Sequence, residues 1–179
     1  MILTGSQILA AIECKEIKIE PFDIKQLNPN SYDLRLAQDV LVYRDKILDA
    51  AVESPPVDYT QLSSGGLLLV PGTLYLMRTV ELTSTRKYVP GIEGRSSIGR
   101  LGISVHVTAG FGDVGFQGTW TLEVSCVQPV RIYAGMRICQ VFFTTCGKPQ
   151  ERDYYLGKYL NQTMPRPSRI ASERNEWLL

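Results

Sequence analysis

Short segments that alternate apolar and polar residues, each ended by glycine or proline, most restrict how this chain can fold. In TWTLEVS (residues 119–125), for example, Trp120, Leu122 and Val124 alternate with polar residues. Successive side chains of a strand point to opposite faces, so this pattern is typical of half-buried β-strands. Because similar segments recur along the chain, we predict an all-β fold, a barrel or a jelly-roll-like sandwich.

One short helix is predicted to precede these strands. Thr4 and Gln7 have the spacing of a capping box, and the apolar residues after them fit an amphipathic helix that ends near Cys14 or Lys15. The predicted strands are residues 17–20, 31–36, 39–44, 67–70, 73–82, 103–108, 119–125, 129–133 and 136–143. Pro71-Gly72 is predicted to join 67–70 to 73–82 in a hairpin-like pair.

Two regions lack this alternation. Residues 49–66, with two prolines and the run SSGG, are predicted to be a long surface loop. Residues 145–179 form a polar, aromatic and basic tail of one domain that spans 1–179. A frayed tail is the simple interpretation, but disordered segments are poor in aromatics. Its tyrosines therefore favour a tail that closes over a ligand or a neighbouring subunit.

Composition excludes several classes of function. The 179 residues carry a formal net charge of +1, which gives no electrostatic case for a nucleic-acid or membrane partner. The four cysteines form no CxxC pair and there is one histidine, so a structural zinc site is poorly supported. Free cysteines and the lack of a signal-peptide pattern or a membrane-spanning apolar run predict a cytoplasmic protein.

The polar groups that could perform chemistry gather in one glycine-rich stretch, residues 94–123. Hydroxyls and backbone amides of such turns can hold phosphate oxygens, and an arginine can clamp them with two hydrogen bonds. The candidate residues here are Arg95, Ser96, Ser97, Arg100, Asp113 and Glu123. This combination predicts a site for a polar, phosphorylated ligand, although short Gly-Ser-Arg segments can also be simple turns.

Glu123 lies on the polar face of its predicted strand, because Leu122 and Val124 point the other way. Taken alone, this position favours a solvated glutamate. A glutamate walled in by a neighbouring subunit could instead serve as a proton shuttle near neutral pH. His106 falls in the middle of the strand predicted for residues 103–108, where a packed structural role is expected.

The run GRSSIGRLGISVHVTAGFGDVGFQGTWTLEV closely resembles the core of the dCTP deaminases, relatives of the trimeric dUTPases. The resemblance extends to MILTGSQIL, to PNSYDLRL and to the tail segments GKYLNQ and PSR, and so covers most of the chain. It implies a distorted β-barrel that assembles as a homotrimer, with active sites shared between subunits. The expected substrates are dCTP and dUTP.

The resemblance also implies chemistry without zinc at the base. Many nucleobase deaminases activate water with zinc held by HxE and PCxxC motifs, and neither motif is present here. The matching position for the general base is Glu123, with Ser96 positioning the water and Arg100 holding the glutamate's ionisation and orientation. Magnesium is expected on the triphosphate oxygens, and dTTP is expected as an inhibitor.

Further residues match the family's nucleotide contacts. Val107, Thr108 and Ala109 are expected to read the edge of the base, while the turn around Arg95 and two tail residues take the phosphates. The full set of expected substrate-binding residues is Arg95, Ser97, Val107, Thr108, Ala109, Gly110, Gln140, Lys158 and Gln162.

One position favours a bifunctional enzyme, which deaminates dCTP and also cleaves dUTP to dUMP and pyrophosphate. In this resemblance a histidine after Thr-Ala is typical of deaminases that stop at dUTP, whereas Gly110 stands here. Asp113 matches the aspartate that orients the hydrolytic water. The turn departs from the family pattern at Gly112, where isoleucine is more usual, and the extra glycine is expected to loosen the loop that carries Asp113.

Three alternatives remain. A deaminase that releases dUTP would have the same base site. A plain dUTPase is disfavoured because its glycine-rich C-terminal phosphate motif is missing here. A non-catalytic nucleotide-binding regulator could keep the barrel, but the joint presence of the four expected catalytic residues argues against it.

Overall fold

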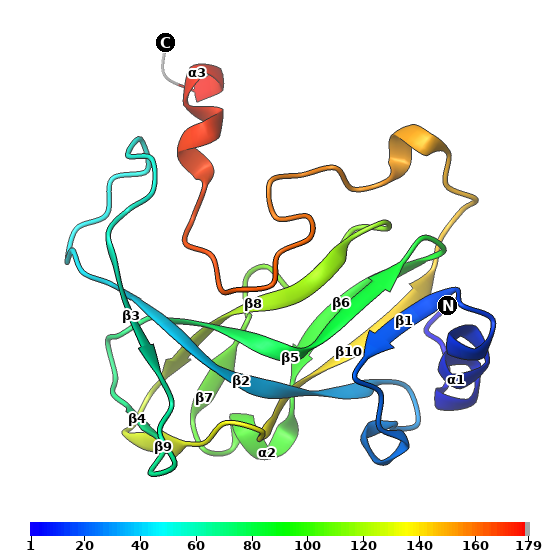
Figure 1. The fold of residues 1–179 in the computed structure, drawn as a ribbon, viewed down its shortest axis with the longest axis horizontal. Coiled ribbons are helices and arrows are strands. Elements are labelled where there is room, and N and C mark those ends of the chain that lie inside the picture. Colours follow the sequence, from blue (N-terminus) through cyan, green and yellow to red (C-terminus); the bar gives the residue numbers. More distant parts are fainter. Residues whose placement is uncertain (178–179) are drawn as a thin grey trace.

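The computed structural model describes residues 1–177 and shows a mainly β molecule with its C-terminal tail folded across one side (Figure 1). The strands are β1 (Ile17–Glu20), β2 (Tyr32–Tyr43), β3 (Val57–Gln61), β4 (Leu67–Leu69), β5 (Tyr75–Thr85), β6 (Tyr88–Gly94), β7 (Ile103–Val105), β8 (Gln117–Cys126), β9 (Val130–Ile132) and β10 (Arg137–Thr145). The helices are α1 (Gly5–Glu13), η1 (Ile24–Gln26), α2 (Ser96–Gly99), η2 (Glu151–Asp153), η3 (Ile170–Glu173) and α3 (Arg174–Trp177).

The N-terminal helix forms as predicted. The Thr4 hydroxyl accepts a hydrogen bond from the Gln7 amide, and the Gln7 side chain accepts one from the Thr4 amide. This reciprocal cap satisfies two donors that the first turn would otherwise leave unpaired. The helix ends at Glu13, with Cys14 as its C-cap.

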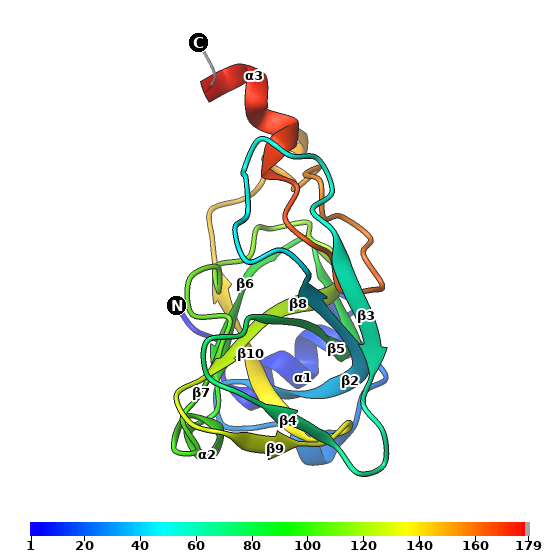
Figure 2. The same cartoon turned by 90° about the vertical axis from the view of Figure 1, so that its left-hand side faces the viewer.

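Eight strands form one antiparallel sheet that curls into a nearly closed barrel. Its main path runs β6-β10-β2-β5-β8-β7, with β1 added to β5 and β3 added to β2. The two ends of this path meet at a bridge between Gly91 and Phe111 and at a hydrogen bond from the Ile92 amide to the Gly110 carbonyl. The pair β4–β9 lies at one end of the barrel (Figure 2).

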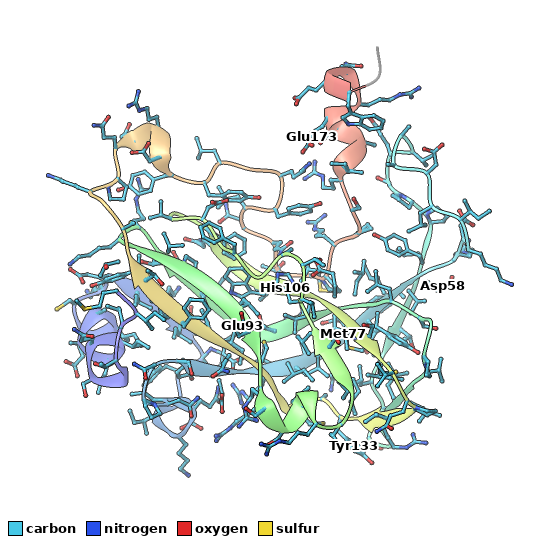
Figure 3. All side chains as sticks on the ribbon, turned by 180° about the vertical axis from the view of Figure 1, so that it is seen from behind. Asp58, Met77, Glu93, His106, Tyr133 and Glu173 are labelled. Carbon is cyan, nitrogen blue, oxygen red and sulfur yellow. The ribbon has the colours of Figure 1, made fainter. Side chains whose placement is uncertain are left out.

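The interior of the barrel is filled by aliphatic and aromatic side chains. Tyr32, Leu122 and Phe143 are fully buried, as is Met77, which Figure 3 labels in the body of the molecule. In β8 the buried residues Trp120, Leu122 and Val124 alternate with partly exposed ones, so the predicted faces of this strand are confirmed. Within residues 1–177 the structure contains no helix long and apolar enough to cross a membrane.

Three predictions of secondary structure were wrong because pairing between distant segments overrides local pattern. The two strands predicted at 31–36 and 39–44 are joined in one continuous strand, β2, whose register against β5 is irregular between Leu36 and Val40. The predicted loop at 49–66 contains β3, which is mostly exposed and is held by its pairing with β2. β4 pairs with the distant β9, so no hairpin forms across Pro71-Gly72.

Strand β6 was not predicted at all. Its sequence, YVPGIEG, contains Pro90 and Gly91, which normally argue against a strand. Here β6 pairs along its length with β10 and stands at the end of the sheet path, where a residue without an amide proton is tolerated.

A buried ion pair ties β2 to β5 and should make stability depend on acid pH. Asp39 accepts hydrogen bonds from the Tyr59 hydroxyl (2.7 Å) and from Nε of Arg78 (2.7 Å), and its side chain is 7% exposed. Burial acts to raise the pKa of Asp39. The Tyr59 hydrogen bond and the Arg78 charge outweigh it, and they hold that pKa below its ordinary value of 3.8.

A depressed folded-state pKa stabilises the protein above the unfolded pKa, and this stabilisation is lost as pH falls through the folded value. Asp39→Asn should therefore lower the free energy of unfolding at pH 7 by about 2 kcal/mol and flatten its decline below pH ~4. Asp58→Asn is the matched control, because Asp58 pairs with Arg44 on the surface and should change stability by about 0.5 kcal/mol or less. Urea unfolding from pH 3 to 7 checks both, and equal effects of the two variants would contradict the prediction.

Candidate active site

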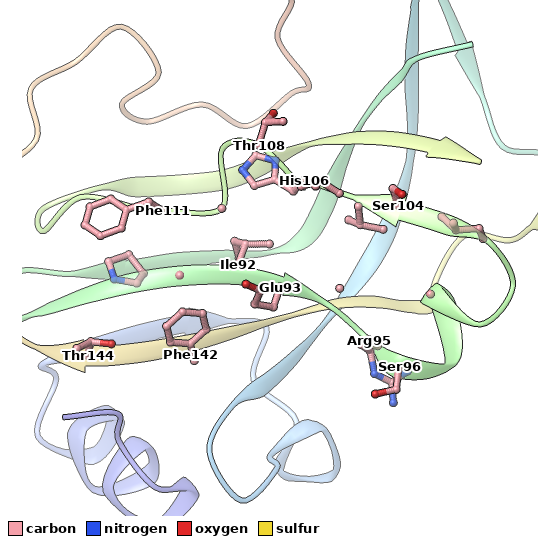
Figure 4. Close-up of a pocket in the computed structure, with 18 of the residues that line it drawn as sticks. Ile92, Glu93, Arg95, Ser96, Ser104, His106, Thr108, Phe111, Phe142 and Thr144 are labelled. Carbon is pink, nitrogen blue, oxygen red and sulfur yellow. The ribbon is translucent and has the colours of Figure 1, made fainter. Parts of the chain in front are cut away.

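A cavity of about 840 Å³ opens where the ends of the sheet path meet, between β6 and the segment 103–111. We call it the seam cavity. Figure 4 shows Arg95 and Ser96 at one end of it, with Phe111 and Phe142 toward the other. It also takes in Thr108, while the apolar Val107 and Phe111 on its rim are 74% and 78% exposed.

The arginine at the end of the seam cavity is fixed from behind by a buried carboxylate. Nε of Arg95 lies 3.0 Å from Oδ1 of Asp33, whose side chain is 2% exposed. Asn28 donates to the same oxygen, and Nη1 of Arg95 donates to the Arg137 carbonyl. A guanidinium anchored on one edge in this way keeps its remaining donors for an anion in the cavity.

The backbone of the same turn is supported by Gln140, one of the expected substrate-binding residues. Its side-chain amide donates to the Gly94 carbonyl (3.1 Å), and its oxygen accepts from the Ser31 hydroxyl (2.7 Å). Ser96 and Ser97 follow at the start of α2, with both residues exposed. Gln140 therefore lies behind the turn, and Ser96 lines the seam cavity.

A second cavity, of about 490 Å³, lies between β8 and the C-terminal tail. We call it the tail cavity. It contains both expected catalytic carboxylates, Glu123 and Asp113, together with Thr121. Tail residues of the same chain complete its wall: Tyr155, Tyr159, Gln162, Arg166, Pro167 and Ser168.

Glu123 is partly enclosed by a histidine. Its Oε2 lies 2.7 Å from Nδ1 of His106, and neither of these two buried atoms has a hydrogen-bond partner among residues 1–177. The Glu123 side chain keeps 32% of its surface exposed, so one side of the carboxylate is packed and the rest faces the cavity. This arrangement orients a carboxylate that can still reach a ligand.

His106 does not lie in the middle of a strand, as predicted. β7 ends at Val105, and His106 has a φ of 54°, in the left-handed region that side chains seldom adopt. The chain turns there, which brings the imidazole to Glu123 and places it at the boundary of both cavities. Figure 3 labels His106 close to where the tail crosses the barrel. It is buried, as expected, but it contacts the expected base.

The loop after His106 presents backbone to both cavities. Val107 and Gly110 line the seam cavity, Ala109 lines the tail cavity, and Thr108 lines both. A Cβ on Gly110 would lie 2.5 Å from the Ile92 carbonyl oxygen, so this path of the loop requires glycine there.

The expected loosening of the Asp113 loop by Gly112 is wrong. The Gly112 amide donates to the Pro90 carbonyl (2.9 Å), and a Cβ on Gly112 would lie 2.6 Å from Cη2 of Trp120. The backbone packs directly on the indole and β6, which leaves no space for a larger residue. Asp113 itself is exposed at the cavity mouth.

Arg100 and Glu123 are not in contact within one chain. Arg100 is the exposed C-cap of α2 and borders neither cavity, and among residues 1–177 no hydrogen bond or ion pair joins it to Glu123. The seam cavity thus holds the arginine and serine of the turn, whereas the tail cavity holds the carboxylates. Within the described part of the chain, residues 1–177, only His106, Thr108 and Phe111 border both cavities.

The tail is fixed to the barrel through Gln162, which is buried. Its side chain donates to the Thr119 carbonyl (2.8 Å), and its own carbonyl accepts from the Thr119 amide (2.9 Å). Lys158 reaches the Glu173 carboxylate and the Arg169 carbonyl. In this conformation the ammonium of Lys158 is paired within the tail.

Residues 2–146 match the family model of dCTP deaminase-like proteins. The chain belongs to the dCTP deaminase-like family. It is 52% identical over 173 residues to "dCTP deaminase, dUMP-forming" of Hathewaya histolytica, which covers 97% of this chain and 99% of that protein. The enzyme of the same name from Leptospira biflexa is also 52% identical, over 97% of this chain and 98% of its own length.

A solved structure supports the fold assigned to this member of the family. The crystal structure of 2'-deoxycytidine 5'-triphosphate deaminase from Agrobacterium tumefaciens superimposes with a TM-score of 0.63 at 24% identity. The match covers 81% of this chain and 48% of that chain. At this level of identity the comparison supports the barrel fold and nothing beyond it.

Sequence reasoning missed three residues of this dCTP deaminase-like site. Asp33 behind Arg95 and Trp120 beside Gly112 are buried, and His106 contacts Glu123. Asp33 gave a signal, because a charged residue between the apolar residues Tyr32 and Leu34 requires a partner when it is buried. Trp120 and His106 gave no such signal. The contact of Trp120 with Gly112 depends on the path of the Asp113 loop, and the contact of His106 with Glu123 depends on the turn at His106.

Gly118→Ala should release the tail from this family member's barrel. Gly118 has a φ of 150°, and a Cβ there would lie 2.8 Å from the Gln162 carbonyl oxygen. We expect trypsin to cleave within residues 158–169 at least tenfold faster, because the anchored backbone would open locally. Gly147→Ala is the control, since a Cβ there meets nothing within 4 Å. Equal cleavage rates in the two variants would contradict this role for Gly118.

Proposed function

We propose that this chain is a dCTP deaminase that forms dUMP, releasing ammonia and pyrophosphate. The observation that carries the proposal is one cavity that holds two carboxylates, Glu123 and Asp113, in a chain 52% identical over nearly its full length to enzymes named for this reaction. The two carboxylates allow two hydrolytic steps: removal of the amino group, then cleavage of the triphosphate.

Deamination begins with a water molecule placed between Glu123 and C4 of the cytosine. Glu123 accepts a proton as the water oxygen bonds to C4 and passes it to the ring nitrogen. It then takes the remaining proton of the new C4 hydroxyl and passes it to the amino group. The C4–N bond breaks, ammonia leaves, and a carbonyl forms at C4. His106, whose Nδ1 lies 2.7 Å from Oε2, packs against one side of the carboxylate during these transfers.

Hydrolysis of the resulting dUTP consumes a second water molecule. Asp113 orients this water toward the α-phosphorus, and the bond from that phosphorus to the bridging oxygen breaks, giving dUMP and pyrophosphate. The exposed position of Asp113 at the cavity mouth suits a group that meets the triphosphate. Gly110 favours this second step as well, because its close approach to Ile92 leaves no space for the histidine expected in enzymes that release dUTP.

The phosphates are assigned to the turn at Arg95 and Ser97 and to the tail residues Lys158 and Gln162, with Val107, Thr108 and Ala109 at the base. Arg95 is held by Asp33 with donors to spare, which supports its role. Lys158 would have to exchange Glu173 for the nucleotide, and the Gln162 side chain would have to exchange the Thr119 carbonyl. Under this proposal the tail closes over the bound nucleotide.

Magnesium fits this arrangement as an ion carried by the nucleotide. Among residues 1–177 no three His, Cys, Asp or Glu side chains gather into a set of ligands, so phosphate oxygens and water would supply most of its coordination. When bound, the ion would neutralise charge on the triphosphate. A cytoplasmic location and inhibition by dTTP belong to the same proposal.

We also propose a homotrimer in which each active site combines two chains. Two observations support it: the turn of Ser96 and Arg100 and the carboxylate Glu123 lie apart within one chain, and the rim of the seam cavity exposes Val107 and Phe111. Exposed apolar residues beside an incomplete site suit a subunit interface.

Mixed trimers test the shared site. Arg100→Ala and Glu123→Gln chains, each inactive alone, should regain about a quarter of the wild-type rate when unfolded together in equal amounts and refolded, because each mixed ring has one junction with both residues intact. Mixing two preparations of the same variant is the control. Lack of recovery in mixtures that sedimentation shows to be trimeric would place the whole site in one chain.

The proposed activity is tested by incubating the protein with dCTP and magnesium and separating the nucleotides over time. Direct appearance of dUMP and pyrophosphate supports the bifunctional enzyme. Accumulating dUTP would instead indicate a deaminase alone. Tight binding of dCTP without any product would favour the regulator.

A further inference from the structure

Trp120 is held rigidly at the wall of the tail cavity. Its indole nitrogen donates to the Thr83 hydroxyl (2.8 Å), and its backbone amide donates to the Thr79 hydroxyl (3.0 Å). The ring of Phe116 lies 4.6 Å from it between centroids. With 5% of its surface exposed, the Trp120 side chain is packed on nearly all sides.

One edge of this indole supports the loop that carries Asp113. A Cβ on Gly112 would lie 2.6 Å from Cη2 of Trp120, so the ring occupies the space that a side chain at 112 would need. The Gly112 amide is tied to Pro90 on its other side. The residue just before Asp113 is therefore held between β6 and the tryptophan.

Trp120 also packs against the histidine that contacts the expected base. The rings of His106 and Trp120 meet edge to face, with centroids 6.3 Å apart and planes inclined by 80°. His106 in turn lies 2.7 Å from Glu123. One side chain thus packs against the supports of both carboxylates of the tail cavity.

We propose that Trp120 is a positioning residue that holds the Asp113 loop against the His106–Glu123 pair, and so determines how much dUTP is hydrolysed before it is released. The inference rests on the proposed function, because it assigns the two steps to these two carboxylates.

The two steps should depend on Trp120 to different degrees. Glu123 lies within β8 and is paired with Leu76 of β5, and its carbonyl accepts from the His106 amide. Its backbone is therefore fixed by the sheet itself. Asp113 lies in an exposed loop outside the sheet, tied to β6 by the Gly112 amide and packed on the indole through Gly112. A shift of about 1 Å in a group that positions water can reduce a rate by about a hundredfold, so loss of the indole should affect hydrolysis most.

The test measures the ratio of dUTP to dUMP formed from dCTP. For Trp120→Leu we expect dUMP formation to fall at least tenfold while dCTP consumption changes about threefold or less, so that dUTP accumulates. Trp120→Phe should give a smaller shift in the same direction. Gly112→Ala disturbs the contact between the loop and the indole while Trp120 itself is intact. It should also raise the ratio of dUTP to dUMP. Circular dichroism and thermal unfolding show which variants fold. If Trp120→Leu does not fold, Trp120→Phe and Gly112→Ala decide the question.

Trp177→Phe is the matched control, because Trp177 lies in α3 with 42% of its surface exposed and lines neither cavity. Its product ratio should equal that of the wild type. Two results would overturn the inference: an unchanged ratio in the folded Trp120 and Gly112 variants, or an equal loss of both steps, which would indicate a purely structural role. A wild-type protein that never forms dUMP would refute the proposed function instead.

Discussion

Glutamine in place of Glu123 is expected to reduce the release of ammonia from dCTP by about a thousandfold or more. The amide has nearly the same size and can still contact His106, but it cannot accept a proton from water. Binding of dCTP should persist, because the expected phosphate and base contacts lie on other residues. Ammonia release and nucleotide chromatography measure the rate, and fluorescence titration or calorimetry measures binding.

Glu93→Gln is the control for this experiment. Glu93 is an exposed glutamate of β6 at the seam cavity (Figure 4), without a role in the proposed mechanism. It should keep its activity within about threefold of wild type. A Glu123→Gln protein that deaminates dCTP at the wild-type rate would remove Glu123 from the mechanism and leave its contact with His106 as a packing feature.

Asp113→Asn is expected to separate the two steps. Formation of dUMP should fall by about a hundredfold to ten-thousandfold, because the asparagine amide carries no negative charge and cannot take a proton from the hydrolytic water. Deamination should continue near the wild-type rate, since Glu123 and His106 are untouched, so dUTP should accumulate. Nucleotide chromatography over time, with pyrophosphate release as a second measure, follows both steps.

Asp58→Asn provides the control for Asp113, because Asp58 pairs on the surface with Arg44, away from both cavities. If Asp113→Asn and the wild type formed dUMP equally fast, the hydrolytic step would need another carboxylate. If deamination fell as steeply as hydrolysis, the loop would be holding the whole nucleotide in place. Both of these outcomes differ from the result expected for Trp120→Phe, in which dUTP accumulates because Asp113 is present but displaced.

Much of the local structure follows from neighbouring residues and could be predicted. The capping box of Thr4 and Gln7 and the faces of β8 depend on contacts within a few positions, which the sequence displays directly. The family could be inferred as well, because its matching segments are spread over most of the chain. Glu123 and Asp113 are already candidates from the glycine-rich stretch, and the family match assigns their expected roles.

The pairing of distant strands could not be predicted in the same way. β4 joins β9 instead of the adjacent β5, and β6 forms a strand despite Pro90 because β10 lies beside it. Such pairings depend on how the whole sheet curls, and the local pattern of a three-residue or proline-containing segment does not specify its partner.

The class of fold, the family and the chemical types of the candidate residues thus follow from the amino-acid sequence, since these depend on local periodicity and on motifs. Which of these groups meet depends on the folded barrel. Barrel closure placed His106 against Glu123, buried Asp33 behind Arg95, and left the turn of Ser96 apart from the carboxylates. It also brought Trp120 against Gly112, where the sequence had suggested a loose loop. These contacts could not be predicted because tertiary packing brings together residues that are far apart in the chain, and a local sequence pattern carries no information about such distances.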